Sequence, residues 1–211
     1  MKSKIDIATW ARRSHFAYFS GYDCPMFSMA FQIEAERLYH YAKDHGISFF
    51  AICLHAMMKA TNSVPQLCQR VENNEVWQYE KTDALTPILA ANGEFTHVVL
   101  PYHPQLETFL DSALPIIETA KSAPAQAKAS NEHRQDLAVY SCIPWIPFTQ
   151  VASAYSNFHQ QFYPLIHWGK IQQDNSSRLS MPVSIQANHV LVDGVHIGKF
   201  YEALNQYCTS L

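Results

Sequence analysis

His189-Val190-Leu191-Val192-Asp193-Gly194, near the C-terminus, lies between two segments of different periodicity. Residues 181–188 alternate between apolar and polar side chains, which predicts a strand. Residues 195–207 carry apolar side chains at helical spacing, which predicts a helix. The stretch therefore connects a strand to a helix, where a side chain can face a cleft while its backbone is held rigidly.

The residue types in this stretch suit proton transfer. His189 can act as a general base, because an unperturbed imidazole is largely neutral at physiological pH. Asp193 can brace the loop through an ion pair, and Gly194 permits a tight turn. The structural alternative is a buried histidine, an N-cap aspartate and a turn glycine. Such a short motif also arises by chance, so the rest of the chain must decide.

Composition limits the class of protein. The 211 residues are 48% hydrophobic and 16% charged, and we expect them to form a single domain over 1–211. The 12 Phe and 11 Tyr favour either a surface covered by an identical subunit or an ordinary aromatic core. A net charge of -3 without a basic run argues against nucleic acid and anionic membranes as partners. The lack of a long apolar segment predicts a cytoplasmic protein without a membrane span.

Cysteine and histidine spacing gives no sign of a disulfide framework or a metal site. The five cysteines are scattered and odd in number, with no C-x-x-C pair. The eleven histidines show no H-E-x-x-H or comparable spacing. We therefore expect no bound metal.

The order of expected elements indicates the fold class. Asn92-Gly93 predicts a two-residue hairpin turn, and Pro115 should kink or divide the helix that contains it. Residues 122–131 and 174–177 read as loops. The mixture of helices and hairpins predicts an α+β fold with two layers, in which helices pack on a mainly antiparallel or mixed sheet. The expected helices are 8–20, 34–45, 49–61, 104–121 and 195–207, and the expected strands are 26–33, 67–71, 75–80, 85–91, 94–100, 137–142, 161–171 and 179–187.

Several separated motifs together resemble one family, the chloramphenicol acetyltransferases. The resemblance covers nearly the whole chain, from about residue 4 to residue 208. Motifs in the same order and at similar intervals are much more specific than one short motif. The matching motifs are Trp10-Ala11-Arg12-Arg13-Ser14-His15-Phe16, Ser141-Cys142-Ile143-Pro144-Trp145, Asn157-Phe158, Pro164-Leu165-Ile166, and the H-x-x-x-D-G of His189 to Gly194.

The resemblance implies the CoA-dependent acyltransferase fold and a homotrimer with active sites between neighbouring subunits. It implies direct transfer of the acetyl group from acetyl-CoA to an acceptor hydroxyl, such as one on chloramphenicol. By position, His189 would be the general base, with its Nδ1–H held by its own backbone carbonyl. Ser141 would donate to the oxyanion, and Asp193 would pair with Arg12 to hold the loop.

The resemblance also implies residues for the two substrates. Trp145, Lys170 and His167 would lie at the coenzyme, while Phe19, Phe27 and Phe95 would line the acceptor pocket. The sequence also departs from the family pattern: Asn188 replaces a second His beside His189, His167 replaces a Thr that helps position a water, and Phe19 replaces a Tyr. These changes spare the catalytic set, so the reaction type is better supported than the acceptor.

Two other interpretations remain open. The catalytic core of the dihydrolipoyl acyltransferases has a similar H-x-x-x-D-G, although such chains also carry lipoyl and subunit-binding domains, for which 211 residues leave no room. A trimeric relative that binds a ligand without acetylating it is the other alternative. Turnover of acetyl-CoA would distinguish an enzyme from such a binding protein.

Overall fold

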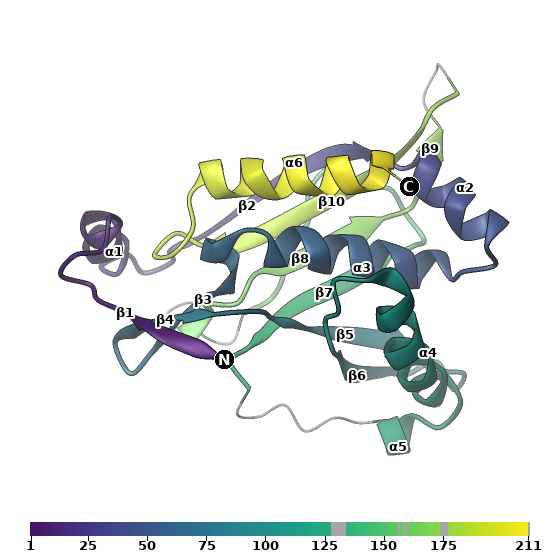
Figure 1. Cartoon of the computed structure of the whole chain (residues 1–211), viewed down its shortest axis with the longest axis horizontal. Helices are drawn as coiled ribbons and strands as arrows, with labels where there is room; N and C mark the ends of the chain where they lie inside the picture. Colours follow the sequence, from purple (N-terminus) through teal and green to yellow (C-terminus); the bar gives the residue numbers. More distant parts are fainter. Residues whose placement is uncertain (128–133, 156, 158–159, 174–176, 211) are drawn as a thin grey trace.

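A mixed β-sheet runs through the middle of the molecule (Figure 1). The computed structural model describes residues 1–127, 134–155, 157, 160–173 and 177–210. Within these residues the sheet has seven strands in the order β2-β10-β8-β7-β5-β6, with the short β9 beside β10. The strands are β2 (Met26–Glu34), β5 (Asp83–Leu89), β6 (Phe95–Leu100), β7 (Leu137–Ile143), β8 (Leu165–Gly169), β9 (Gln172–Gln173) and β10 (Leu179–Asn188).

Strand direction fixes which residues meet at each end of the sheet. β7 runs parallel to both β5 and β8, whereas β10 runs antiparallel to β8 and to β2. β7 and β8 therefore finish at the same end, with Ile143 paired to Gly169. β10 finishes at the opposite end, and the loop that contains His189 follows it there.

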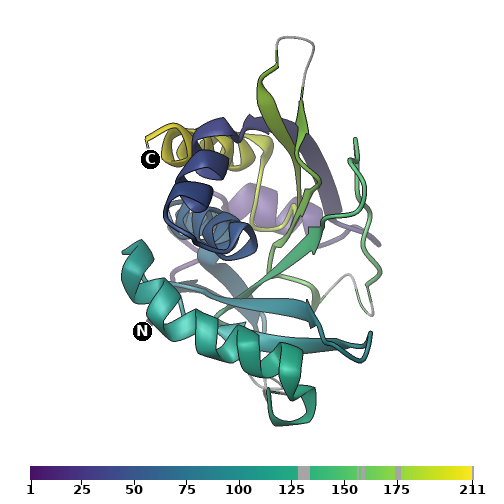
Figure 2. The same ribbon diagram turned by 90° about the vertical axis from the view of Figure 1, so that its right-hand side faces the viewer.

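The larger helices lie on one face of this sheet. The helices are α1 (Arg13–Phe19), α2 (Glu36–Asp44), α3 (Phe49–Asn62), α4 (Leu106–Ser122), α5 (Pro124–Ala127) and α6 (Gly194–Ser210). Figure 2 shows α3, α4 and α6 gathered to one side of the strands. Alternate strand residues such as Ile166, Trp168 and Ile185 join the core with this helical layer. The residues between them, among them Ser141 and His167, face the other side of the sheet.

A second, three-stranded sheet has the order β1-β4-β3 and lies beside the start of β7 (Figure 1). Its strands are β1 (Lys2–Ile5), β3 (Gln69–Glu72) and β4 (Glu75–Tyr79), and the 3-10 helix η1 (Pro65–Cys68) precedes β3. Asn73 and Asn74 form the β3–β4 turn with φ of 52° and 63°, a left-handed conformation that asparagine tolerates. The buried Arg70 donates to the carbonyls of Gln135 and Leu137 and so ties this sheet to β7.

Most expected elements are present, with informative differences. Helix α1 begins at Arg13 rather than residue 8, because Asp6 Oδ1 accepts from the Ala8 amide at 3.0 Å and holds a turn. α4 is one continuous helix, so of the two effects expected of Pro115, a kink or a division, the division is wrong. The expectations for residues 128–131, Phe158 and 174–176 lie outside the described residues. Within the described chain, no helix combines the length and apolar character that crossing a bilayer requires.

Candidate active site

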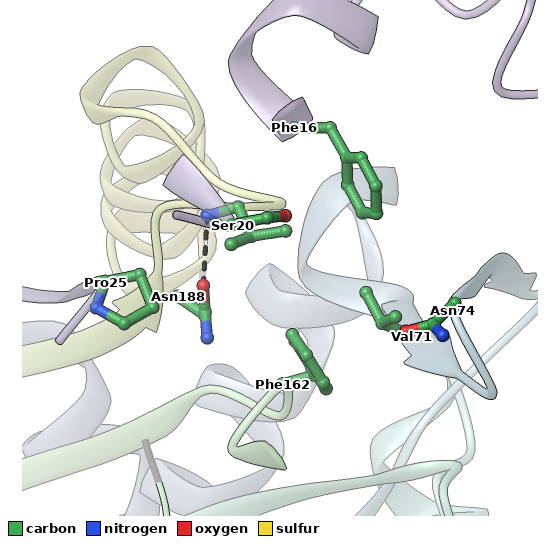
Figure 3. Close-up of a pocket in the computed structure, with 8 residues that line it drawn as sticks. Phe16, Ser20, Pro25, Val71, Asn74, Phe162 and Asn188 are labelled. Carbon is green, nitrogen blue, oxygen red and sulfur yellow. Dashed lines mark hydrogen bonds between the residues drawn. The ribbon is translucent and has the colours of Figure 1, made fainter. Parts of the chain in front are cut away.

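Hydrogen bonds to backbone groups on both sides of His189 fix the loop that carries it. The His189 amide donates to the Pro25 carbonyl at 2.8 Å, and the His189 carbonyl accepts from Arg12 Nη2 at 3.2 Å. Asn188 Oδ1 accepts from the Val190 amide at 3.0 Å (Figure 3). These bonds hold the loop on both sides of the histidine, so the backbone from which the His189 ring projects has a defined position.

Arg12 and Asp193 form the ion pair that the sequence predicts. Arg12 Nη1 donates to Asp193 Oδ2, and the arginine side chain is buried. Burial opposes ionisation of Asp193, but the hydrogen bond and charge of Arg12 outweigh it and lower the pKa of this carboxyl. Asp193 is therefore a carboxylate at neutral pH and compensates the buried guanidinium.

The imidazole of His189 faces the same carboxylate. His189 Nδ1 lies 3.2 Å from Asp193 Oδ1, and among the described residues neither atom makes a hydrogen bond. The expected partner of Nδ1, the carbonyl of His189 itself, instead accepts from Arg12. A carboxylate beside Nδ1 favours the tautomer with the proton on that nitrogen, which leaves Nε2 unprotonated.

Two aromatic rings hold the imidazole in place. Phe19 stacks on His189 with ring centroids 3.9 Å apart and planes within 11°, and Phe27 lies 4.5 Å away at 35°. Both were expected to line the acceptor pocket, and both meet the base directly. The His189 side chain remains 31% exposed, so a substrate can reach it.

A cavity of about 190 Å³ lies beside this loop (Figure 3). Phe16 and Phe162 lie on opposite sides of it. The buried Asn188 also lines it and donates through Nδ2 to the Gln161 carbonyl at 3.2 Å. Asn188 therefore braces the loop backbone. The full lining is Phe16, Ser20, Pro25, Val71, Asn74, Phe162, Asn188 and Val190.

A second group of predicted residues lies on β7 and β8. Ser141 is paired in register with His167, which is paired with Ser184 on β10, so the three share one face of the sheet. His167 Nε2 lies 3.0 Å from Ser153 Oγ. Burial lowers the pKa of His167 to about 4, and its ring is therefore neutral at pH 7.

One chain does not bring Ser141 and His189 together. Ser184, level with Ser141, lies five residues before His189, or about 16 Å along β10 at ~3.3 Å per residue. Two strand spacings across the sheet add about 10 Å at right angles. The two Cα atoms are thus about 19 Å apart, which exceeds the combined reach of a serine and a histidine side chain.

Lys170 follows β8 and lines a larger pocket of about 450 Å³ at the end of the sheet opposite His189. Phe50 and Ile171 line it as well. Trp145 lies outside this lining and is 60% exposed. The ten residues that line this pocket are mostly apolar and come from distant segments: Tyr39, Phe49, Phe50, Cys142, Pro144, Trp168, Gly169, Lys170, Ile171 and Leu179.

Phe95 also lies far from His189. It begins β6, the edge strand four positions from β10 in the sheet, and is 55% exposed. The sequence-predicted residues thus form two groups in one chain. Arg12, Phe19, Phe27 and Asp193 surround His189, whereas Ser141, Trp145, His167, Lys170 and Phe95 lie on the β7, β8 and β6 side.

Sequence reasoning missed residues 151–155, which cover the polar face of the sheet at Gln186. Gln186 donates through Nε2 to the Val151 carbonyl, and its Oε1 accepts from the Ser153 amide and the Tyr155 hydroxyl. Polar residues alternating with Val183, Ile185 and Ala187 along β10 were the available signal for a second face. The described residues hold no group of three or more His, Cys, Asp or Glu side chains arranged to bind a metal.

Comparison with known proteins places the fold among acyltransferase cores. A chloramphenicol acetyltransferase structure superposes with a TM-score of 0.88 at 28% identity, covering 99% of this chain and all of that one. The cubic core of a pyruvate dehydrogenase multienzyme complex gives 0.69 at 13% identity, over 94% and 87% of the two chains, a likeness of fold alone.

The sequence comparisons then give the family. The family model for chloramphenicol acetyltransferase matches residues 2–205, and the chain belongs to this family. Chloramphenicol acetyltransferase 3 of Escherichia coli is 25% identical, over 99% of this chain and 97% of that protein. The chloramphenicol acetyltransferase of Proteus mirabilis is 24% identical, over 97% and 93%. The chain is therefore an acyltransferase that uses acetyl-CoA.

Proposed function

We propose that this protein acetylates an acceptor hydroxyl with acetyl-CoA as donor and with His189 as the general base. The observation that carries the proposal is the placement of the His189 ring. Its Nδ1 faces the Asp193 carboxylate at 3.2 Å, two phenylalanines hold the ring, and part of it remains exposed. This arrangement supports an unprotonated Nε2 directed at a substrate.

The reaction proceeds by direct attack. Nε2 of His189 takes the proton of the acceptor hydroxyl as that oxygen attacks the thioester carbonyl of acetyl-CoA. The tetrahedral intermediate collapses and expels the CoA thiolate, which takes the proton from the imidazolium. The products are the acetyl ester and free CoA. A general base of this kind contributes roughly 10²–10⁴-fold to the rate.

The active site forms between two chains of a trimer. The separation of about 19 Å within one chain supports the view that Ser141 reaches the His189 of a neighbouring copy. Its hydroxyl then donates to the oxyanion, an interaction worth about 3 kcal/mol. Large apolar side chains exposed on the single chain, among them Tyr18, Met29 and Trp145, support an apolar surface that other copies cover.

The pocket beside Lys170 receives the coenzyme. Its mostly apolar walls suit the pantetheine arm, and the Lys170 ammonium suits a phosphate group of CoA. The exposed Trp145 ring offers a surface for the adenine base. His167 lies beside Ser141 on the same face and contributes to the coenzyme side of the same interface.

Chloramphenicol, which gives the relatives their name, is the acceptor that we test first. Phe19 and Phe27 give the site apolar walls against which an aromatic acceptor can pack, and Phe95, which lies far from His189 within one chain, would join them from the neighbouring copy. Acetylation of chloramphenicol in the cytoplasm would make the protein a determinant of antibiotic resistance. The replacement of a family tyrosine by Phe19 favours testing other aromatic alcohols as well.

The test is release of free CoA thiol from acetyl-CoA in the presence of chloramphenicol and a panel of hydroxylated acceptors. We expect turnover that depends on the acceptor. Dihydrolipoamide belongs in the panel, because turnover with it alone would favour the dihydrolipoyl acyltransferase alternative. Binding of an acceptor without any turnover would favour the non-catalytic alternative.

A further inference from the structure

His196 lies at the start of α6, three residues after Asp193. The Asp193 carbonyl accepts from the amides of His196 at 3.0 Å and Ile197 at 3.4 Å, which makes Asp193 the N-cap residue of this helix. In the reverse direction, Nδ1 of His196 accepts from the Asp193 amide at 2.8 Å. The imidazole is buried.

This arrangement differs from an ordinary aspartate cap. An N-cap carboxylate usually accepts from amides of the first helical turn. Here one oxygen of Asp193 accepts from Arg12 and the other faces His189 Nδ1. A side chain at the third helical position that accepts from the N-cap amide is one half of a capping box, in which glutamate or glutamine is usual. In this protein His196 takes the role of that glutamate or glutamine and holds the N-cap amide. The Asp193 carboxylate is then left to contact Arg12 and His189.

We propose that His196 is a positioning residue for the general base: its Nδ1 holds the Asp193 amide and thereby directs the Asp193 carboxylate toward Arg12 and His189. The inference rests on the proposed acetyl transfer. Without the acceptor at Nδ1, the Asp193 amide loses its partner, and the Asp193 carboxylate can rotate away from His189. Misplacement of a catalytic group by about 1 Å costs about 10²-fold in rate.

The interaction exists only while His196 is neutral. The charged and titratable groups around it are Arg12 before α1, Asp193 on the loop, whose carboxylate also faces His189, and Lys199 on the next turn of α6. Burial, followed by the charge of Arg12, lowers the pKa of His196. The acceptor is therefore present at neutral pH and is lost on acidification, when a protonated Nδ1 would face the Asp193 N–H.

Two substitutions test the inference by steady-state kinetics. His196→Asn keeps an acceptor close to the position of Nδ1, whereas His196→Leu removes it at similar size. We expect kcat to fall about 10- to 100-fold in H196L, with KM for acetyl-CoA changed by less than about threefold. H196N should restore kcat to within about fivefold of wild type and show a shallower acid limb in its pH profile, because one titrating group is gone. Wild-type kcat in H196L, or H196N as slow as H196L, would overturn the inference.

A spectroscopic measurement separates this inference from the proposed function. Nitrogen-15 NMR of the wild-type imidazoles should give His196 an unprotonated Nδ1 and a protonated Nε2 at pH 7. A proton on Nδ1 would refute the inference whatever the activity of the protein and whether or not H196L folds. Absence of turnover with every acceptor, together with the expected tautomer, would refute the proposed function and with it the catalytic role, leaving His196 a helix cap.

Discussion

Two inactive variants should restore each other when their chains assemble together. His189→Ala removes the base and Ser141→Ala removes the oxyanion donor, and each change should lower kcat by roughly 10²–10⁴-fold and 10²–10³-fold, respectively. Because the two residues lie about 19 Å apart in one chain, the proposed active site draws them from different chains. A mixed assembly then contains sites in which both residues are intact.

The recovery can be calculated from the symmetry. In a cyclic trimer with two chains of one variant and one of the other, about one site in three pairs an intact His189 with an intact Ser141. Co-expression with two different affinity tags and purification on both isolates these mixed trimers. Release of CoA thiol should reach about a third of the wild-type rate per trimer. Mixed trimers as slow as their parents would show that one chain supplies both residues and would refute the two-chain site.

Three further predictions concern the neighbourhood of the site and the core. Asp193→Ala leaves the buried Arg12 guanidinium uncompensated and should lower the free energy of unfolding by about 3 kcal/mol in denaturant titrations, the low end of the usual range because Asp193 is partly exposed. Burial lowers the pKa of His55 and of His167 from 6.5 to about 4, so the unfolded chain takes up protons first as pH falls. The free energy of unfolding should therefore drop by up to about 3 kcal/mol per histidine between pH 7 and pH 4, and His167→Thr should flatten this dependence. The same pH dependence in His167→Thr as in wild type would contradict a lowered pKa of His167. Phe19→Tyr adds a hydroxyl beside His189 and should tighten chloramphenicol about fivefold in KM, while a KM unchanged or raised would remove Phe19 from the acceptor pocket.

Local signals explain why much of the fold can be predicted from the sequence. Ser48 caps α3 by accepting from the Ala51 amide, as a serine before an apolar helical run predicts. Gly93 adopts φ of 84° in the expected hairpin, but the loop between Leu89 and Phe95 is longer than the two residues predicted. The start of α1 was misplaced because one side chain, Asp6, diverts the backbone into a turn that helical spacing does not reveal.

Long-range geometry explains what the sequence left undetermined. The parallel pairing of β7 with β5 and β8 depends on segments far apart in the chain, and it sets Ser141 away from His189. The resemblance indicated the pairing of Asp193 with Arg12 but not the neighbour of His189 Nδ1, because Arg12 also reaches the His189 carbonyl and leaves Nδ1 facing Asp193. His196 was missed, although its position three residues after the N-cap is where a capping side chain is expected.

The central claim is that one imidazole takes the proton of the acceptor hydroxyl. Its most direct test is kcat of His189→Ala for acetyl-CoA and the best acceptor of the panel, with His40→Ala, an exposed histidine on α2, as the matched control. We predict a loss of roughly 10²–10⁴-fold in kcat for H189A, with acetyl-CoA binding retained, and wild-type kcat for H40A. An H189A protein that turns over at the wild-type rate would contradict the account.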